Sequence, residues 1–175
     1  DILPYTEREI VEFTVPYGKT GVYWFDVPET YTFADSFLVN TVITKFGSIP
    51  DWYNHLTWIT AHIFPEAWVS SRRGIEFFSQ VSYAMTKVTD RFSGIGVAMR
   101  AEITGQKAGK PHTYISTMVH HDTAIAAGAG TGAIAQLILA GRLKQPGIYP
   151  IEQALSTELF VEMMNSRQIE IIVNS

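Results

Sequence analysis

The small-residue stretch Ala124 to Gly141 constrains the fold more than any other part of the chain. It has no charged residue over 18 positions and is dense in alanine and glycine. Asp122 stands where an N-cap carboxylate is favourable, and a glycine just after an apolar run is typical of a helix stop. The length is close to that of a membrane span, but Gln136 and the many small residues make a poor lipid-facing surface. We therefore expect a packed helix from Thr123 to about Leu143.

Inside this stretch, Gly128 to Ala133 matches the G-x-G-x-x-G/A pattern of dinucleotide-binding loops, and Glu152 follows at about the spacing of a ribose-binding carboxylate. The pattern requires a strand that ends just before the first glycine, because the phosphate binds at the amino end of the next helix. Here the preceding strand is expected to end near His121, and Pro150 disfavours a second strand at Glu152. We expect no cofactor bound by this chain. We interpret the small residues as a helix-packing face that contains Ala124, Gly128, Gly132 and Ala140.

Two alternating runs, Ser93 to Thr104 and His112 to His121, predict an antiparallel strand pair in front of this helix. With the turn centred near Ala108, the cross-strand pairs are Arg100 with Ser116, Glu102 with Tyr114, and Gly96 with His120. One face would then contain Gly96, Ala98, Arg100, Glu102, Tyr114, Ser116, Met118 and His120. The other face is the expected core side, with Ile95, Val97, Met99, Ala101, Ile115, Thr117 and Val119. A one-residue slip of the turn would change the partners but leave each strand's own alternation intact.

The rest of the chain predicts further strands and helices. The expected strands are Glu9 to Val15, Gly21 to Val27, Phe37 to Phe46 and Ile169 to Val173. The expected helices run from Asp51 to about Phe64, from about Ile75 to Phe92, and from Thr157 to Arg167, with one turn at Glu152 to Leu155. The hydroxyl of Ser48 is placed to cap the first of them, and Ser70 to Gly74 is expected to be a loop. The prediction is an α+β fold in one domain, residues 1–175, with a mixed, largely antiparallel sheet covered on one face by helices.

Composition limits the classes of function. The chain has 175 residues, of which 46% are hydrophobic, enough for one domain with a core or for part of a larger protein. A net charge of −4 without a block of like charge gives no electrostatic footprint for nucleic acid or an anionic membrane, so neither partner is expected. The absence of cysteine excludes disulfides and thiol catalysis and is compatible with a cytoplasmic protein.

The polar face of the strand pair supplies the candidate substrate-binding residues. Arg100 comes first, because a planar guanidinium pairs with a carboxylate through two parallel hydrogen bonds. An ion pair with Glu102, or a subunit contact, is its structural alternative. His120 comes second because its charge responds near neutral pH, with strand capping or an interface as its alternative. Tyr114 and Ser116 are secondary polar contacts, and no catalytic residue is assigned.

A metal site is not expected. His120 and His121 are adjacent in a predicted strand, so their imidazoles would point to opposite faces of the sheet. His55 and His62 lie seven positions apart on a predicted helix, which is too far for a two-ligand site. The chemistry of the chain therefore depends on hydroxyls, carboxylates, single histidines and arginines.

The last third of the chain also carries a family resemblance. A small-residue helix ends in Gly141-Arg142-Leu143 and is followed by Pro146-Gly147-Ile148-Tyr149-Pro150-Ile151-Glu152, with Phe160 and Arg167-Gln168-Ile169 further on. These residues resemble the tail of saccharopine dehydrogenase-like oxidoreductases, in which the segment is Gly-Val-x-x-Pro-Glu. Ile148 and Ile151 are departures from that pattern. Upstream, Tyr23 to Glu29 and Lys45-Phe46-Gly47 resemble the family's Pro-Glu pair and its later Lys-x-Gly.

The resemblance implies a function for a larger protein. Members have a Rossmann NAD(P)-binding domain joined to an α+β domain that helps to bind an amino-acid-derived substrate and often mediates dimerisation. This chain begins after the point where that Rossmann domain would end. We therefore expect a piece excised from a longer chain, with NAD or NADP bound by the missing N-terminal domain. A homodimer and a small-molecule substrate are further expectations, and the fragment alone should be inactive.

Two other functions stay open at this point. The first is a non-catalytic module in which the face with Gly96, Arg100 and His120 is a self-association surface. The second is a stand-alone small-molecule-binding domain. Loss of a dimer without loss of substrate affinity on replacing Arg100 would favour the first over a carboxylate clamp.

Overall fold

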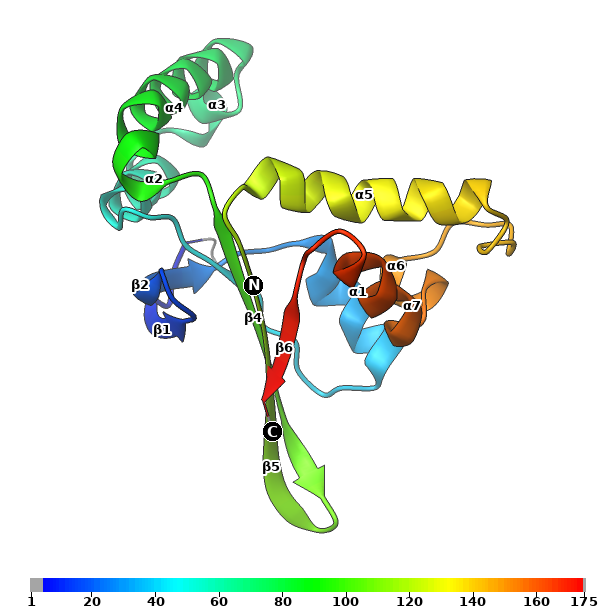
Figure 1. The fold of residues 1–175 in the computed structure, drawn as a ribbon. Coiled ribbons are helices and arrows are strands. Elements are labelled where there is room, and N and C mark those ends of the chain that lie inside the picture. The colour runs from blue at the N-terminus through cyan, green and yellow to red at the C-terminus, as the bar shows by residue number, and fades with distance from the viewer. Residues whose placement is uncertain (1–4, 175) are drawn as a thin grey trace. The chain divides into compact units, whose positions relative to one another are not determined.

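Helices and antiparallel strands make up the computed structural model, which describes residues 5–174 (Figure 1). The described residues form seven helices and two three-stranded sheets, so the predicted α+β class is confirmed. The described strands are divided between two small sheets, so the prediction of a single sheet is wrong. The chain forms two compact units: unit 1 comprises the described residues up to Glu12 with Lys19–Gly94, and unit 2 comprises Phe13–Gly18 and the residues from Ile95 onward. The single excised domain stays a prediction.

The sheet of unit 1 is built from a hairpin and a short third strand. β1 (Glu9–Phe13) and β2 (Gly18–Trp24) are neighbours, which confirms the predicted hairpin. β3 (Lys45–Phe46) pairs antiparallel with β2. The predicted third strand, Phe37 to Phe46, is wrong because only its last two residues pair with a neighbour.

α1 (Pro28–Phe37), which was not predicted from the sequence, precedes β3. Pro28 lies in its first turn, where the fixed φ of proline suits a helix and no N–H is needed. Leu38 ends the helix in the left-handed region, with φ 52°. The following residues form no regular element before β3, and Ile43 is exposed. The proline that ends the β2 segment therefore also starts a helix.

The centre of unit 1 is polar. Asn54, in the first turn of α2 (Trp52–Ile63), is 0% exposed. Its Oδ1 accepts hydrogen bonds from the Tyr5 hydroxyl at 3.1 Å and from the Ser48 N–H at 2.8 Å. Its Nδ2 donates to three acceptors: the carbonyl oxygens of Gly21 at 3.3 Å and Ser48 at 3.0 Å, and Asp51 Oδ1 at 2.9 Å. One amide thus connects β2, the segment before α2, and α2 itself.

The start of α2 differs in detail from the prediction, although the helix itself is confirmed. The expected side-chain cap from Ser48 does not form, because the residue at the cap position is Asp51 and no side-chain cap bond is made. Ser48 instead uses its backbone N–H and carbonyl, both bonded to Asn54. The buried Asn54 amide therefore holds the segment before α2 against the helix, although no side chain caps the first N–H groups of α2.

Two further helices complete unit 1, α3 (Glu66–Val69) and α4 (Arg72–Ser93). The Ser71 hydroxyl accepts from the Gly74 N–H at 3.0 Å and caps α4. The predicted loop, Ser70 to Gly74, is therefore wrong in its second half, since α4 begins three residues before the expected Ile75.

Aromatic side chains join these helices. The rings of Phe64, Trp68 and Phe78 contact one another, with centroids 5.3–5.5 Å apart. Other large apolar side chains, such as Ile63 and Phe92, are exposed. All four tryptophans of the chain belong to unit 1: Trp24, Trp52, Trp58 and Trp68.

The sheet of unit 2 contains the predicted strand pair and the predicted last strand. β4 (Val97–Lys107) and β5 (Lys110–His120) form a long antiparallel hairpin. β6 (Ile171–Asn174) pairs antiparallel with β5, so the strand order is β4-β5-β6. The hairpin loop has two residues, Ala108 and Gly109, both with positive φ, as a type I′ turn requires.

This two-residue loop shifts the register by one residue from the predicted one. Arg100 lies opposite Thr117, where Ser116 was expected, and Glu102 lies opposite Ile115. The predicted core side is also wrong for β4, because Met99 is 60% exposed and lies opposite Met118. A loop centred on one residue and a loop of two residues differ by one position along the partner strand, which explains the shift.

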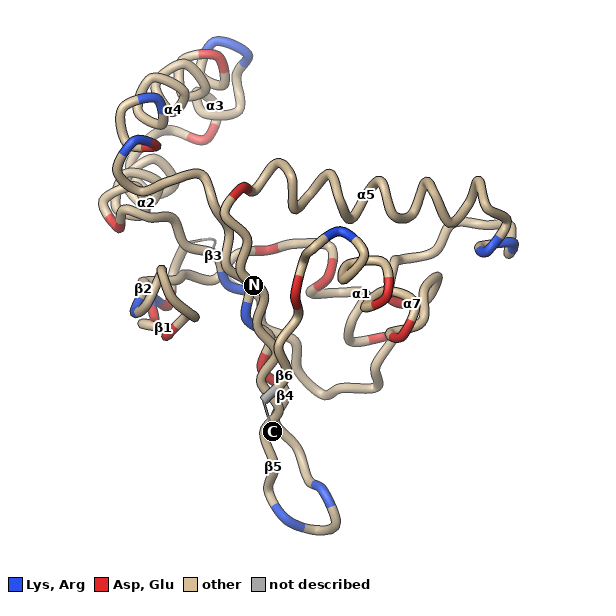
Figure 2. Tube along the Cα trace, viewed as in Figure 1, with Lys and Arg blue, Asp and Glu red and all other residues tan. Residues whose placement is uncertain are grey.

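The small-residue helix is α5 (Thr123–Leu139). The Asp122 carboxylate accepts from the Ile125 N–H at 2.9 Å, and Gly141 follows the helix with φ 66°, so the predicted start and stop are confirmed. Charged residues are absent along α5 and appear only beyond its ends (Figure 2). Among the described residues, no helix is both long and apolar enough to cross a membrane.

The apolar core of unit 2 lies between α5 and α7 (Thr157–Asn165), with α6 (Ile151–Ala154) beside them. Its buried members are Ala133, Leu137, Met163, Met164 and Ile169, and Met118 and Ile171 of the sheet pack against them. Both short helices confirm the sequence analysis. The predicted packing face does not, because a Cβ added to Gly128 or Gly132 would meet no neighbouring atom within 4 Å.

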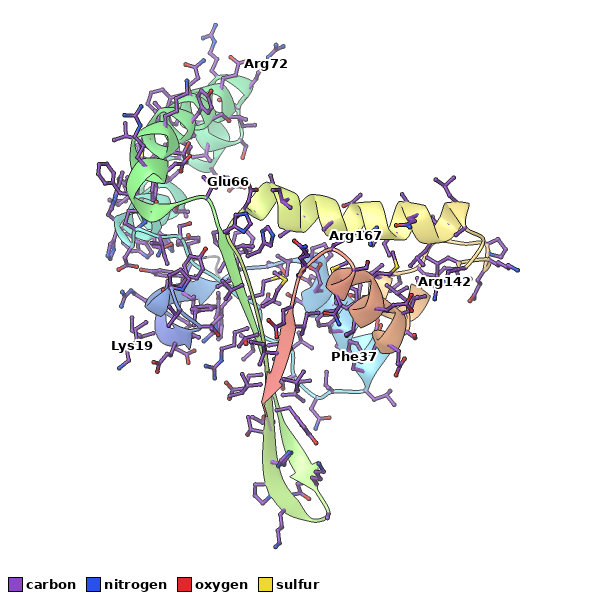
Figure 3. The ribbon with its side chains drawn as sticks, viewed as in Figure 1. Lys19, Phe37, Glu66, Arg72, Arg142 and Arg167 are labelled. Carbon is purple, nitrogen blue, oxygen red and sulfur yellow. The ribbon has the colours of Figure 1, made fainter. Side chains whose placement is uncertain are left out.

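Two arginines fasten α5 to α7 at the surface (Figure 3). Arg142, just after α5, donates to both carboxylate oxygens of Glu162 on α7, at 3.1 and 3.3 Å. Arg167, just after α7, donates to Oε1 of Gln136 on α5 at 2.6 Å. Each terminal segment is therefore tied back to the neighbouring helix.

Candidate functional site

The register of the β4–β5 hairpin separates the predicted site residues. Directly opposite residues of an antiparallel pair share a face. Ser116 pairs with Ala101 and His120 with Val97, so Ser116 and His120 share a face with odd-numbered residues of β4. Arg100 is even-numbered and lies on the other face. The prediction that Arg100, Tyr114, Ser116 and His120 share one face is therefore wrong.

Arg100 makes the contact that was its structural alternative. Its guanidinium donates to Glu102 Oε2 at 2.7 Å, along the same strand and on the same face. Its side chain is 23% exposed and that of Glu102 is 47% exposed. The two charges compensate one another at the edge of the sheet.

Tyr114 and Ser116 lie away from His120 on the same strand. The Tyr114 hydroxyl accepts from Lys107 Nζ at 2.6 Å, near the tip of the hairpin. Six residues of a strand, from Tyr114 to His120, span roughly 20 Å. Ser116 lies between them, opposite Ala101 on one side and Val173 on the other. The structure thus brings none of the other predicted residues to His120.

A different set of polar groups surrounds His120, at the point where β5 ends and α5 begins. We call this set the His120 junction: Tyr17, Gly96, His120, His121 and Asp122. His120 is 9% exposed, and its Nδ1 lies 3.0 Å from the Asp122 N–H and 2.7 Å from the Asp122 carbonyl oxygen. These two short contacts with the Asp122 backbone hold the buried imidazole of His120 in one orientation.

Gly96 allows the Tyr17 hydroxyl to approach the junction. A Cβ at position 96 would lie 2.1 Å from the Tyr17 hydroxyl oxygen and 2.7 Å from the His120 carbonyl oxygen. Both distances are too short for a contact between a Cβ and an oxygen atom, so glycine fits here without a shift of the neighbours. Tyr17 comes from the turn between β1 and β2, which belongs to unit 2. Partial burial raises the pKa of the Tyr17 hydroxyl, a group that is already protonated at neutral pH.

The start of α5 is tied to the segment before β4. The Thr123 N–H and hydroxyl both donate to the Ile95 carbonyl oxygen at 2.8 Å. Ile95 and Asp122 also form an isolated parallel bridge. With Asp122 capping α5, the backbone on either side of His120 and His121 is fixed by hydrogen bonds.

The two histidine rings of the junction lie face to face. Their centroids are 4.4 Å apart and their planes differ by 27°. The prediction of opposite faces is wrong because β5 ends at His120, so His121 no longer follows the alternation of a strand. Even so, among residues 5–174 no group of three or more His, Asp or Glu side chains could hold a metal ion.

The chemistry available at the junction is hydrogen bonding and proton exchange with a small polar ligand. Tyr17 offers a phenol, His121 an exposed imidazole, and α5 the positive end of its helix dipole. The Asp122 carboxylate already caps the amino end of α5, so the phenol and the imidazole favour a neutral carbonyl or hydroxyl oxygen over a second carboxylate.

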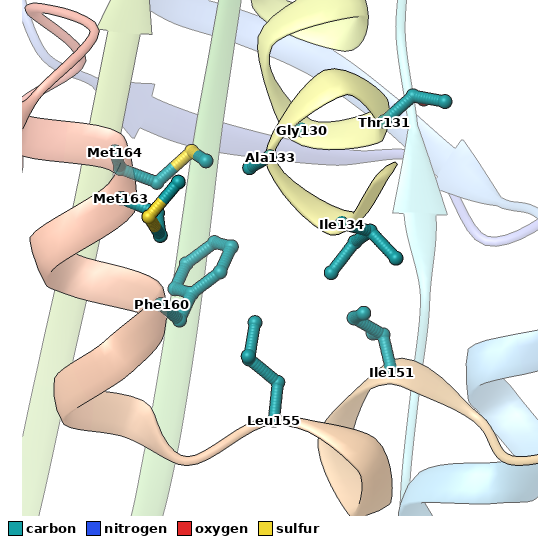
Figure 4. Close-up of a pocket in the computed structure, with 9 residues that line it drawn as sticks. All are labelled: Gly130, Thr131, Ala133, Ile134, Ile151, Leu155, Phe160, Met163 and Met164. Carbon is teal, nitrogen blue, oxygen red and sulfur yellow. The ribbon is translucent and has the colours of Figure 1, made fainter. Parts of the chain in front are cut away.

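A second feature of unit 2 is a small apolar cavity between α5, α6 and α7 (Figure 4). Its volume is about 240 Å³. Thr131 is its one polar side chain, and the Thr131 hydroxyl already donates to the Ala127 carbonyl oxygen at 3.2 Å. The other lining residues are Gly130, Ala133, Ile134, Ile151, Leu155, Phe160, Met163 and Met164. Ile151, one of the departures from the family pattern, lines this cavity.

Sequence reasoning found part of the junction and missed the rest. The triplet from His120 to Asp122 stands out in the sequence, and the cap by Asp122 is confirmed. Tyr17 lies 79 positions before Gly96 in the sequence, and no local pattern connects them. The isolated glycine before a strand was the available signal, because such a glycine often marks a close approach of another group.

No protein-family model matches this chain, and a search of curated proteins found no significant match. The resemblance to saccharopine dehydrogenase-like oxidoreductases therefore stays a prediction from the residues alone.

Proposed function

We propose that this chain is the substrate-binding part of an NAD(P)-dependent, saccharopine dehydrogenase-like oxidoreductase that acts on an amino-acid-derived substrate. In this proposal an N-terminal Rossmann domain of the same cytoplasmic protein binds NAD or NADP. Hydride transfer belongs to the nicotinamide, and this chain positions the substrate. The fragment alone is expected to be inactive.

The observation that carries the proposal is the His120 junction. A carbonyl group of a substrate fits the Tyr17 hydroxyl and the His121 imidazole, next to the amino end of α5 that Asp122 caps. The His120 imidazole contacts the Asp122 backbone and so fixes the start of α5 beside these two groups. Arg100 takes no part, because it lies on the other face of the hairpin and pairs with Glu102.

The experiment uses the protein with its Rossmann domain. NADH and NADPH oxidation is measured with a panel of amino acids and 2-oxo acids, and the reverse reaction with their secondary-amine products. We expect His121→Gln and Tyr17→Phe each to raise KM several-fold, up to about 10-fold, since each alters a hydrogen bond to the substrate carbonyl oxygen. His62→Gln is the matched control, because His62 lies on α2 in unit 1.

Two results would contradict the proposal. The first is the absence of nicotinamide-dependent turnover with every substrate of the panel. The second is turnover in which the two junction variants keep the wild-type KM. A KM change shared by His62→Gln would assign the effect to general destabilisation instead.

The cavity between α5, α6 and α7 favours a second candidate function, a small-molecule-binding module. Its lining is apolar, so the ligand would carry an aliphatic or aromatic group small enough for about 240 Å³. This function predicts a rise in Tm of the chain alone with such a compound, and loss of the rise in Ala133→Leu, which fills the cavity. The other alternative, a self-association module, would use Arg100 and His120 from opposite faces of the hairpin rather than from one shared face.

A further inference from the structure

β4 is a long edge strand of the β4-β5-β6 sheet. β4 has 11 residues and, among the described strands, a neighbour on one side only. Alternate residues of such an edge strand direct N–H and C=O groups away from the sheet, where another strand can pair with them. β4 contains no proline, and Met99 and Ile103 are 60% and 62% exposed. Among the features that prevent edge-to-edge pairing, β4 lacks proline and shortness, and its charged residues are Arg100, Glu102 and Lys107.

The residues of β4 are complementary to the same residues read in the opposite direction. With Ala101 at the centre, Arg100 and Glu102 stand one position to either side, and Met99 and Ile103 stand two positions to either side. In an antiparallel pair of two β4 strands centred on Ala101, each Arg100 lies opposite a Glu102 of the other copy. On the opposite face each Met99 meets an Ile103 of the other copy. Opposite charges and apolar pairs facing across strands both stabilise a sheet.

Neighbouring registers are disfavoured by the same charges. Moving the centre to Arg100 places two guanidinium groups opposite each other, and moving it to Glu102 places two carboxylates opposite each other. A shift that places the centre between two residues brings the charged face of one copy beside the apolar face of the other. The charge pattern thus selects one register.

We propose that β4 pairs with β4 of a second copy of this chain, antiparallel and centred on Ala101. The β4-β5-β6 sheet of one copy and the β4-β5-β6 sheet of the other then form one continuous sheet across a two-fold axis. The Arg100–Glu102 pair within each copy persists, because each carboxylate can accept from both guanidinium groups. Arg100 and Glu102 of both copies then form a group of four alternating charges on one face of the interface between the copies.

This inference does not rest on the proposed oxidoreductase function. It concerns another surface, and its test measures association without any substrate or nicotinamide. A monomeric chain would therefore not contradict the oxidoreductase function, and an inactive protein would not contradict the pairing of β4 strands.

The test measures the Kd of self-association by analytical ultracentrifugation. Arg100→Glu puts carboxylates at positions 100 and 102 of both copies, and Glu102→Arg puts guanidinium groups at both positions. We expect each single variant to raise the Kd at least about 10-fold, because two attractive pairs become repulsive. The double variant R100E/E102R restores the opposite charges in every pair, so its Kd should return to the wild-type value.

The decisive arm mixes the two single variants in equal amounts. Opposite charges then face each other across the edge only between unlike copies, so a one-to-one complex should form although neither variant associates alone. Lys110→Glu is the control, because Lys110 lies on β5 rather than on the free edge. Circular dichroism confirms folding of each variant.

Three results would overturn the proposal. One is a wild-type chain that stays monomeric at every concentration measured. Another is a wild-type dimer whose Kd is the same in both single variants. The third is an equal mixture of folded single variants that does not associate, which would assign their effect to the pair within each chain.

Discussion

The two units of this protein are held together by different kinds of interaction. In unit 1 the most buried large side chain, Asn54, is polar, and its amide makes hydrogen bonds to four residues. In unit 2 the buried side chains are apolar and gather where α5 meets α7. A hydrogen-bonded centre depends on the geometry of a single group, whereas an apolar core shares its contribution among many contacts. The units should therefore respond differently to substitution.

The apolar core of unit 2 gives the largest expected effect. Leu137→Ala should lower the free energy of unfolding by about 2–5 kcal/mol, because it removes a fully buried side chain and leaves a cavity. Hydrogen exchange read by peptide should show the loss in α5 and α7 and little change in α2. Equal loss of protection in α2 would show that the two units unfold together, and it would contradict the expectation that they respond differently to substitution.

The polar centre of unit 1 gives the next largest effect. Asn54→Ala should cost about 1–3 kcal/mol, because the Ser48 N–H and the Gly21 carbonyl lose a partner in a buried place. Protection should fall in β2 and α2. The matched variant Asn54→Asp keeps an acceptor for Ser48 but sets a carboxylate 2.9 Å from Asp51 Oδ1, so it should be no better than alanine. Rescue by Asn54→Asp would show that only the acceptor matters.

The helix α5 offers a smaller effect of opposite sign. Gly128→Ala should stabilise unit 2 by about 0.5–1 kcal/mol, since alanine is the better helix former and no neighbour lies within 4 Å of the added Cβ. The midpoint of urea unfolding measures the change. Gly96→Ala is the contrasting variant and should destabilise, because the Tyr17 hydroxyl occupies the space. Loss of stability in Gly128→Ala would reveal a packing partner for that face.

The smallest effect is the pH dependence of unit 1. The hydrogen bond from Asn54, followed by Arg8, lowers the pKa of Asp51 below its ordinary value of 3.8, against the opposing effect of burial. A lowered pKa stabilises the folded state above the unfolded-state pKa, and this contribution is lost as the pH falls through the lower, folded value. The urea concentration needed to unfold unit 1 should therefore fall on acidification below about pH 4. The control variant Asp51→Asn should show a flatter acid limb, and an unchanged limb would contradict the assignment.

The differences between sequence and structure have local causes. The hairpin was visible from its alternation, but its register depends on whether the loop has one central residue or two, and Ala108-Gly109 adopts the two-residue turn. That single residue moves Arg100 to the face away from His120. The run after Phe37 alternates like a strand, yet most of it has no neighbouring strand to pair with. Alternation is a property of one segment, whereas a sheet needs a partner.

The helix starts, stops and caps of the last third were predictable because they depend on neighbouring residues. Asp122 and Gly141 act on the turns beside them. The contacts that define the candidate site are not local. Tyr17 meets Gly96, and Asn54 meets Gly21, across long stretches of chain. Such pairs cannot be derived from the spacing of residues in one sequence.

The distribution of the tryptophans gives the protein a built-in optical label. All four lie in unit 1, while unit 2 has tyrosine and phenylalanine but no tryptophan. Emission excited at the red edge of the indole band therefore reports the surroundings of α2, α3 and β2 alone. Quenching by iodide or acrylamide follows unit 1 in the intact chain, and no probe has to be attached.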